Sequence, residues 1–452
     1  MSATVRSFNP ANPADLVIEV PAPGAFGAAA AVERARAAQP GWLAAGAAAR
    51  SAALGRAAEA VEAHAEELAA LAGREVGKPL GEARGEVART VAILRYYAQA
   101  PYAASGAVHE TAAGQGLLLT RRRPYGVAGL ITPWNFPFAI PVWKAAPALA
   151  VGNTVALKPA PEATACALRL AELLALPEDV LTVLPGGAEE GAAVVSAADI
   201  VSFTGSTGTG QAVIRTATER SVPVQAEMGG LNAAIVLPDA DIEQAAAQLA
   251  FAIAGYAGQK CTATSRVIAV GDALEPLRAA LGKALAAAGA DSGPVISEAA
   301  RERLTGAIAS AVEGSAELLA GGQLPQRDGW FIEPTLLARV PAGHPLLAEE
   351  FFGPVAVLLG AADLDEAIAL ANATRHNLSA SVHTRELDVA LAAADRLDAG
   401  MIRINAPSSG VDFHLPFGGA KAASYGSREQ GQAALDFYTA SRTVSLLPAG
   451  GA

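Results

Sequence analysis

The sequence predicts an α/β protein built from two domains with parallel sheets. Short apolar runs alternate with helical segments along most of its 452 residues, of which 52% are hydrophobic and only 17% are charged. Such a chain can bury a large core, and its length fits two or three domains. Strands and helices that alternate at this spacing are typical of βαβ units, whose sheets are covered by helices on both faces.

Composition and charge exclude several classes of protein. There are 33 Lys and Arg residues against 44 Asp and Glu residues, and the net charge of −11 argues against nucleic-acid binding. With two cysteines, neither a disulfide framework nor a metal site is expected. The N-terminus lacks the features of a signal peptide, so a cytoplasmic protein is expected. The apolar stretch 127–143 contains three prolines, so we interpret it as a buried strand and a turn rather than a membrane span.

The first part of the chain is expected to form helices and then a β-like run. Residues 25–102 are rich in Ala, Glu, Arg and Leu at helical spacing, which predicts two or three amphipathic helices. Residues 106–123 contain the run GLLLTRRR, which reads as a strand that ends in a basic cluster. We interpret this cluster as a solvated edge or a subunit contact.

The alternation that begins at residue 127 predicts the first sheet. Its expected strands are 127–132, 153–158, 179–184, 199–205 and 222–228, and its expected helices are 141–151, 163–174, 189–198 and 207–219. This order favours a Rossmann-like dinucleotide-binding sheet. The usual GxGxxG motif is absent after the first strand, where the chain has Thr132-Pro133-Trp134-Asn135 instead.

A second alternation predicts a second α/β domain from about residue 230. Its expected strands are 232–237, 265–270, 354–360, 379–384 and 401–405, and its first expected helix is 242–256. The tail contains the run TVSLL at 443–447, which reads as an exposed strand. Because edge strands tend to pair with other strands, we expect a subunit contact there.

Three polar residues that follow apolar segments are the first candidates for chemistry. Cys261 has a glycine three positions before it, Lys260 beside it to favour the thiolate, and small residues after it. Glu227 ends an expected strand and could act as a general base, and the amide of Asn135 could donate to an oxyanion. Each has an ordinary alternative: a buried thiol, an exposed turn carboxylate and a turn asparagine. Cys166 lies on an apolar helix and is expected in the core.

Six motifs, taken together, resemble those of the aldehyde dehydrogenase superfamily. They are TPWNFP (132–137), FTGSTGTG (203–210), EMGG (227–230), GQKCTATSR (258–266), EEFFGP (349–354) and PFGGAK (416–421). The resemblance runs from about Asn9 to Val444. The strings GQKCTATSR and GVDFHLPFGGAK are similar to those of the 2-oxoglutarate semialdehyde dehydrogenase-like group.

The resemblance implies oxidation of an aldehyde to a carboxylic acid with NAD(P)+. In this reaction the Cys261 thiolate adds to the aldehyde, and the Asn135 amide stabilises the oxyanion of the thiohemiacetal. NAD(P)+ accepts a hydride, and the thioester that remains is hydrolysed with Glu227 as general base. Lys144 and Glu429 match a proton-relay pair of the family, with an inter-domain ion pair as the alternative.

Two other functions fit the resemblance less well. An acyl-coenzyme A-forming dehydrogenase is disfavoured because a glutamate stands at position 227. A catalytically silent structural relative would be expected to lack Cys261, Glu227 or Asn135, and all three are present.

The resemblance also implies which residues bind the dinucleotide. Gly205, Ser206 and Gly210 match the helix start near the pyrophosphate, where free N–H groups favour anions. The other matched positions are Lys158 at the adenosine ribose, Glu350 at the nicotinamide ribose, Phe352 at the ring, and Thr132, Pro133 and Trp134 along the channel. Pro161 stands where many NAD-preferring relatives have a ribose-binding glutamate, and Glu162 is one position too far along. This departure predicts that NADP+ is accepted or preferred, with NAD+ as the alternative.

For the substrate, the resemblance implies a pocket with room for a carboxylated aldehyde. The matched positions are Phe136, Trp143, Lys260 and Thr262, with Ala139, Ile140 and Gly255 near the entrance. An oxo-acid semialdehyde would need an anchor such as Lys260 or His414, and an apolar or aromatic aldehyde is the alternative.

We expect an NAD(P)-binding domain of residues 1–105 and 124–229, a catalytic domain of residues 230–429, and a small β oligomerisation element of residues 106–123 and 430–452. The expected assembly is a homodimer or homotetramer. The chain is shorter than typical members at its N-terminus and near residues 282–293, which argues against an N-terminal hairpin of the family type.

Overall fold

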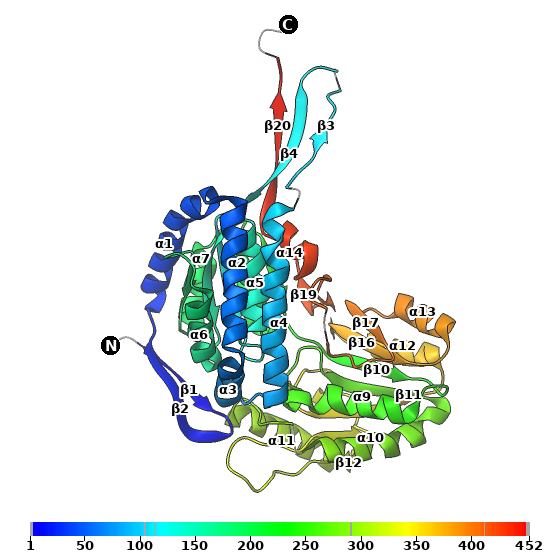
Figure 1. Ribbon diagram of the computed structural model, residues 1–452. Coiled ribbons are helices and arrows are strands. Elements are labelled where there is room, and N and C mark those ends of the chain that lie inside the picture. The colour runs from blue at the N-terminus through cyan, green and yellow to red at the C-terminus, as the bar shows by residue number, and fades with distance from the viewer. Residues whose placement is uncertain (1–2, 104, 113, 290–291, 411, 449–452) are drawn as a thin grey trace.

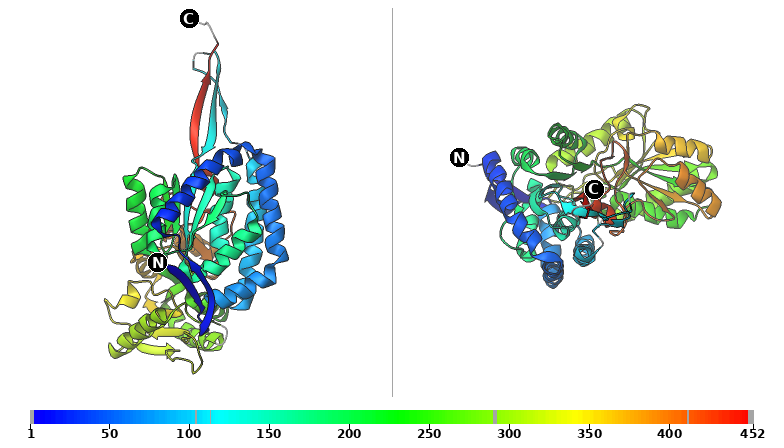
Figure 2. Two further views of the ribbon diagram at one scale, coloured as in Figure 1. Left: turned by 90° about the vertical axis from the view of Figure 1, so that its left-hand side faces the viewer. Right: turned by 90° about the horizontal axis from the view of Figure 1, so that it is seen from above.

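The computed structural model describes residues 3–103, 105–112, 114–289, 292–410 and 412–448. It shows two α/β bodies from which a β arm projects (Figure 1; Figure 2). The predicted α/β class is confirmed. Positions 113 and 411, which fall within the expected β-like run and the string GVDFHLPFGGAK, and 449–452 in the tail, lie outside the described residues. Within the described ranges, no helix is both long and apolar enough to span a bilayer.

The first body contains a six-stranded sheet in the order β19-β9-β8-β5-β6-β7. Its strands are β5 (Val127–Thr132), β6 (Thr154–Pro159), β7 (Leu181–Val183), β8 (Ile200–Thr204), β9 (Val224–Glu227) and β19 (Ser424–Tyr425). All neighbours run parallel except β19, which pairs antiparallel with β9. The strand order reverses between β5 and β8, and ligands bind at the carboxyl ends of strands beside such a switch point.

Helices surround this sheet. They are α1 (Gly24–Ala44), α2 (Gly46–Ala63), α3 (Ala65–Val76), α4 (Leu80–Ala98), α5 (Ala139–Ala150), α6 (Thr164–Leu174), α7 (Ala188–Ala197), α8 (Thr207–Glu219) and α14 (Gly431–Phe437). Residues 25–102 therefore form four long helices rather than two or three, since turns at Ala45, His64 and Gly77 divide the Ala-rich segment. Cys166 is fully buried in the core, as predicted.

The second body contains a seven-stranded sheet in the order β12-β13-β14-β11-β10-β16-β17. Its strands are β10 (Asn232–Val236), β11 (Thr264–Val270), β12 (Glu317–Ala320), β13 (Thr335–Ala338), β14 (Val355–Ala361), β16 (Ser379–His383) and β17 (Met401–Ile404). Its helices are α9 (Ile242–Ala254), α10 (Leu274–Ala288), α11 (Glu298–Glu313), α12 (Leu364–Asn372) and α13 (Leu387–Arg396). A small pair, β15 (His376–Asn377) and β18 (Ala420–Lys421), lies outside both large sheets.

The arm is a three-stranded antiparallel sheet made from distant parts of the chain. Its strands are β3 (Val108–His109), β4 (Leu117–Pro124) and β20 (Thr439–Leu446), in the order β20-β4-β3. The two long strands pair over their full length and extend away from both bodies (Figure 1). The strand expected within residues 106–123 and the strand expected in the tail are both present, as β4 and β20.

The expectation that an N-terminal hairpin is missing is wrong. β1 (Thr4–Asn9) and β2 (Asn12–Pro21) form an antiparallel hairpin beside α3. Its tight turn is held by the Asn9 side chain, whose oxygen accepts from the N–H of Ala11 at 2.9 Å. The Ser7 hydroxyl donates to Glu75 on α3 at 2.7 Å. The hairpin is compact, because one turn of two residues connects its strands.

Candidate active site

A cavity of about 530 Å³ is lined by residues of both bodies. It lies at the carboxyl ends of β5 and β8, beside the loop that precedes β11. Of the predicted site residues, it is lined by Pro133, Trp134, Asn135, Gly205, Ser206, Cys261, Glu350 and Phe352. Residues that are far apart in the sequence therefore meet in one cavity.

Cys261 lies on a tightly constrained loop. The 3₁₀ turn before it, η3 (Gly255–Gly258), holds Tyr256 and Ala257 at φ near +51°, in the left-handed region. Gly258 has φ +65°, and a Cβ there would collide with the backbone of Gly353, so only glycine fits. The side-chain amide of Asn232 donates to the carbonyl of Cys261 at 2.8 Å. These constraints fix the thiol against the cavity.

The amide of Asn135 reaches from the first body to this loop. Its Nδ2 donates to the carbonyl of Gln259 at 2.9 Å. An amide nitrogen carries two N–H groups, so a second one remains for a ligand near Cys261. Its Oδ1 has no hydrogen-bond partner among the residues that the structure describes.

Negative charges surround the thiol. Burial raises the pKa of Cys261, and the carboxylates of Glu350, Glu227 and Glu429 raise that pKa further. Lys260, expected to favour the thiolate, forms an ion pair with Glu82 at 2.5 Å. Its charge is thus neutralised by a carboxylate whose pairing with Lys260 could not be predicted from local sequence.

Glu227 ends β9 inside the protein and does not line the cavity. It is 2% exposed, and its Oε2 accepts from the hydroxyl of Ser424 at 2.5 Å. Burial and the nearby charge of Glu429 raise the pKa of Glu227 well above its usual range. A carboxyl group with a raised pKa is a better proton acceptor, as a general base requires.

Lys144 and Glu429 form a buried ion pair. The Lys144 ammonium also donates to Ser202 at 2.7 Å, and the indole N–H of Trp143 donates to Glu429 at 2.8 Å. Burial lowers the pKa of Lys144, and the charge of Glu429 offsets only part of this shift. Trp143 packs against Phe417 with ring centroids 5.6 Å apart and does not line the cavity. Its indole therefore holds Glu429 in place.

The opposite wall of the cavity suits the anionic part of a dinucleotide. The first turn of α8 starts after Ser206, and no side chain caps its free N–H groups. Such an N-terminus favours phosphate. The buried hydroxyls of Thr132 and Thr204 have no partner within the described part of the chain, and both lie at the ends of strands that border the cavity. Gly210 lies in the first turn of the same helix.

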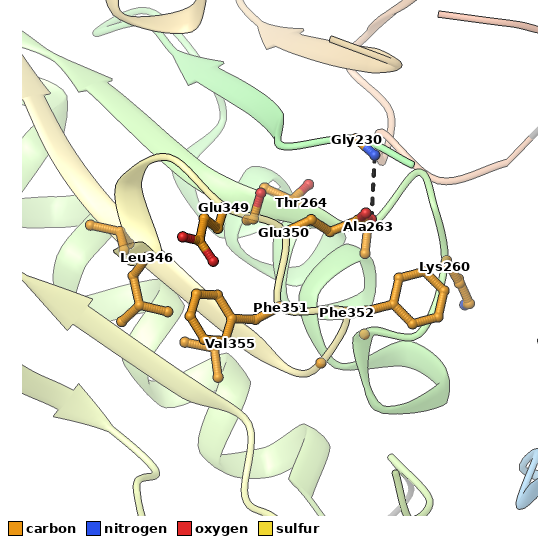
Figure 3. A pocket seen from close by; sticks show the side chains of 14 residues that line it. Gly230, Lys260, Ala263, Thr264, Leu346, Glu349, Glu350, Phe351, Phe352 and Val355 are labelled. Carbon is orange, nitrogen blue, oxygen red and sulfur yellow. Dashed lines mark hydrogen bonds between the residues drawn. The ribbon is translucent and has the colours of Figure 1, made fainter. Parts of the chain in front are cut away.

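Glu350 stands between this wall and the thiol. Its Oε1 accepts from the N–H of Gly230 at 3.3 Å, shown as a dashed line in Figure 3. Burial raises the pKa of Glu350 to about 8. Gly229 has φ +81°, and a Cβ there would collide with the carboxylate of Glu350. Phe352 packs edge-on against Trp134 with centroids 5.6 Å apart. These contacts place Glu350 where it can accept from ribose hydroxyls.

Ile140, expected near the substrate entrance, also lines the cavity, whereas Lys158, Phe136 and Thr262 do not. Lys158 is buried at the end of β6, where burial lowers its pKa while Glu162 and Glu190 raise it. The ring of Phe136 lies 3.9 Å from the ammonium of Lys78. The carbonyl of Thr262 accepts from Ser408 at 2.8 Å.

Several residues that line the cavity were not among the predicted site residues, and Thr207, Arg303 and His376 are three of them. Thr207 and His376 line it and contact each other at 3.3 Å. Arg303 on α11 also lines it and donates to the carbonyl of Glu350 at 3.1 Å. Thr207 lies within FTGSTGTG and could have been chosen, whereas Arg303 and His376 carry no local signal.

One cavity is lined by a cysteine and by an uncapped helix N-terminus, an arrangement that fits a dinucleotide-dependent oxidoreductase. The profile of the aldehyde dehydrogenase family matches residues 1–444. The chain therefore belongs to the aldehyde dehydrogenase family, whose members oxidise an aldehyde to the carboxylic acid with a nicotinamide cofactor.

Similar proteins agree with this assignment. An alpha-ketoglutaric semialdehyde dehydrogenase of Bacillus subtilis is 39% identical, over 98% of this chain and 95% of the relative. An alpha-ketoglutarate semialdehyde dehydrogenase of Haloferax volcanii is 38% identical over the same shares. The NAD+ complex of an aldehyde dehydrogenase from Bacillus cereus has a TM-score of 0.94 at 34% identity, covering 98% of this chain and 93% of that one.

Proposed function

We propose that this enzyme oxidises an oxo-acid semialdehyde of the 2-oxoglutarate semialdehyde type, with Cys261 as nucleophile. The observation that carries the proposal is the cavity that joins Cys261 and Asn135 to the N-terminus of α8. The names of the two relatives at 38–39% identity support the substrate class. Lys260 is paired with Glu82, so a substrate carboxylate would have to displace Glu82 to bind it.

In the proposed mechanism the chain's own groups act in sequence. The Cys261 sulfur adds to the aldehyde carbon, and the Asn135 amide donates to the oxygen that becomes an oxyanion. A nicotinamide held by Glu350 and Phe352 would supply the acceptor for the hydride that the substrate carbon loses. Glu227 then takes a proton from water as the water attacks the Cys261 thioester, and the carboxylic acid leaves. Lys144 and Glu429 would carry the proton onward from Glu227.

The residues proposed to hold the dinucleotide are those of the cavity and its borders. Ser206, Gly205 and Gly210 would face the pyrophosphate, and Glu350 the nicotinamide ribose, with Phe352 against the ring and Thr132, Pro133 and Trp134 along the channel. Lys158 would face the adenosine ribose. We propose that NADP+ is used as well as NAD+, because Pro161 supplies no carboxylate to repel a 2′-phosphate.

We also propose the domain division and an oligomer. Residues 1–105 and 124–229 would bind NAD(P), residues 230–429 would carry the catalytic cysteine, and residues 106–123 and 430–452 would join subunits into a homodimer or homotetramer. The exposed apolar side chains of the arm, such as Val108 and Leu446, support this role.

An absorbance assay of NAD(P)H formation tests the substrate class. We expect kcat/KM for 2-oxoglutarate semialdehyde to exceed that for phenylacetaldehyde and for butanal by at least about 10-fold, since a charged substrate group adds specific polar contacts. The Cys261→Ser variant should lose turnover with every aldehyde, whereas Cys166→Ser should retain it. A preference for phenylacetaldehyde, or turnover by Cys261→Ser, would contradict the proposal.

A further inference from the structure

Glu86 and Lys78 form an ion pair inside the first body, outside all six family motifs. Glu86 on α4 is 4% exposed, Lys78 just before α4 is 2% exposed, and their side chains are in direct contact. Burying two charges costs solvation free energy. This cost is offset only if the charges are paired and make further hydrogen bonds. Both residues make such further contacts, and these contacts lead toward Asn135 and Cys261.

Glu86 holds the turn that carries Asn135. Its Oε1 accepts from the backbone N–H groups of Phe138 and Ala139, at 2.8 Å and 3.0 Å. These are the first N–H groups of α5, and the first turn of a helix has no acceptors of its own for them. A negative charge at this end also interacts favourably with the helix dipole. The carboxylate therefore fixes the segment from Asn135 to α5.

Lys78 contacts that segment and the nucleophile loop at the same time. Its ammonium lies 3.9 Å from the ring centroid of Phe136, the residue after Asn135. It lies 4.7 Å from the ring centroid of Tyr256, in the turn that leads to Cys261. Tyr256 cannot move easily, because its hydroxyl donates to the carbonyl of Val76 at 2.9 Å. A desolvated cation on aromatic faces is a favourable contact.

The hydrogen bond from Asn135 to Gln259 joins the same two segments at 2.9 Å. The relative position of the amide and the thiol thus depends on both segments. We infer that Glu86 and Lys78 are positioning residues for the oxyanion site: Glu86 fixes the turn of Asn135, and Lys78 spaces that turn against the loop of Cys261. The inference rests on the proposed function, in which the Asn135 amide donates to the oxyanion.

A double-mutant cycle tests whether Glu86 acts through Asn135. We expect Glu86→Gln to lower kcat by about 10- to 100-fold, less than the roughly 100- to 1,000-fold cost of losing an oxyanion donor. The affinity for the dinucleotide, measured by its quenching of protein fluorescence, should be unchanged. In the Asn135→Ala background, Glu86→Gln should lower kcat by less than about threefold, because groups that act as a unit are not additive. If Glu86→Gln and Asn135→Ala instead lower kcat by independent factors that multiply, the inference is wrong.

Matched variants separate positioning from folding. Glu66→Gln removes the same charge from an exposed pair with Arg84 and should leave kcat unchanged. Lys78→Arg keeps a cation at the two rings and should restore most of the kcat that Lys78→Met loses. If Glu86→Gln shows no cooperative unfolding transition, the double-mutant cycle is repeated with Lys78→Met and Asn135→Ala. If these two substitutions lower kcat by factors that multiply, the inference is wrong. If Asn135→Ala alone leaves kcat unchanged, the proposed role of Asn135 fails as well, which distinguishes the two failures.

Discussion

The Cys261 thiol is buried within the electrostatic influence of Glu350, Glu227 and Glu429, and two lysines of the predicted site are engaged by other carboxylates. Lys144 is paired with Glu429 and Lys260 with Glu82. The pKa of the Cys261 thiol is accordingly raised, which favours the thiol over the thiolate.

Replacing Glu227 should separate the two halves of the reaction. Glu227→Gln removes the base for thioester hydrolysis, and we expect steady-state turnover to fall by about 100-fold or more. A first burst of NAD(P)H, measured by rapid mixing, should remain. Because the pKa of Glu227 is raised, the wild-type rate should rise with pH above the usual carboxylate range as Glu227 loses its proton. The variant should lack that rise, and an unchanged pH profile would contradict the assignment.

Local motifs pointed to Cys261, Asn135 and Glu227, since each stands next to glycines or prolines in a recognisable string, and the structure places the first two at the cavity. The pairing of Lys260 with Glu82 was not predictable, because Glu82 lies in the first turn of α4 and Lys260 lies on a loop of the second body that is distant in sequence. The same holds for Arg303 and His376, which only tertiary structure brings to the cavity.

Among the elements, the short 3₁₀ turn η2 (Pro161–Ala163) after β6 bears on cofactor choice. It begins with Pro161, three positions after Lys158. Pro161→Glu adds a carboxylate beside the proposed adenosine ribose, and we expect kcat/KM with NADP+ to fall by about 10-fold or more relative to NAD+, through repulsion of the 2′-phosphate. Steady-state kinetics with both cofactors measure this ratio.

The control for this change is Gln323→Glu, which adds the same charge at an exposed position of the second body. The ratio should not change in this variant. A wild-type enzyme with a large preference for NAD+ would refute the proposal that NADP+ is used.

The central strands of both sheets were predictable because buried parallel strands are nearly continuous apolar runs. The strands β12, β13 and β19, which lie at or next to sheet edges, were not predicted. The hairpin β1–β2 was missed for a physical reason. Only Val5 and Ser7 of β1 are buried, so its alternation is too short to stand out, and its stability comes from contacts with Glu75 on α3. The boundaries between the helices of residues 25–102 were also not predicted, because alanine is as frequent around the turns at Ala45 and His64 as within the helices.

For the whole molecule, the arm predicts an assembly that depends on the apolar residues near its tip. Leu446 and Leu447 are 53% and 71% exposed. If the arm joins subunits, Leu446→Glu with Leu447→Glu should place charges in that contact and reduce the mass found by light scattering. Leu387→Glu, at a 70% exposed position on α13, is the matched control and should leave the mass unchanged. An unaltered mass in the double variant would show that the arm tip does not join subunits.

The contacts of the first body include residues 429–438, which follow the whole second body in the sequence. Tyr97 on α4 donates to the carbonyl of Gly431 at 3.1 Å, and Asn153 before β6 donates to that of Tyr438 at 3.0 Å. Lys144 forms its ion pair with Glu429, which lies 285 residues further along the chain. A fragment that stops at residue 229 would lack this carboxylate and would also lack β19, the strand that covers the edge of β9. The first sheet therefore cannot reach its full set of contacts as a separate unit, because part of it is supplied from beyond the second body.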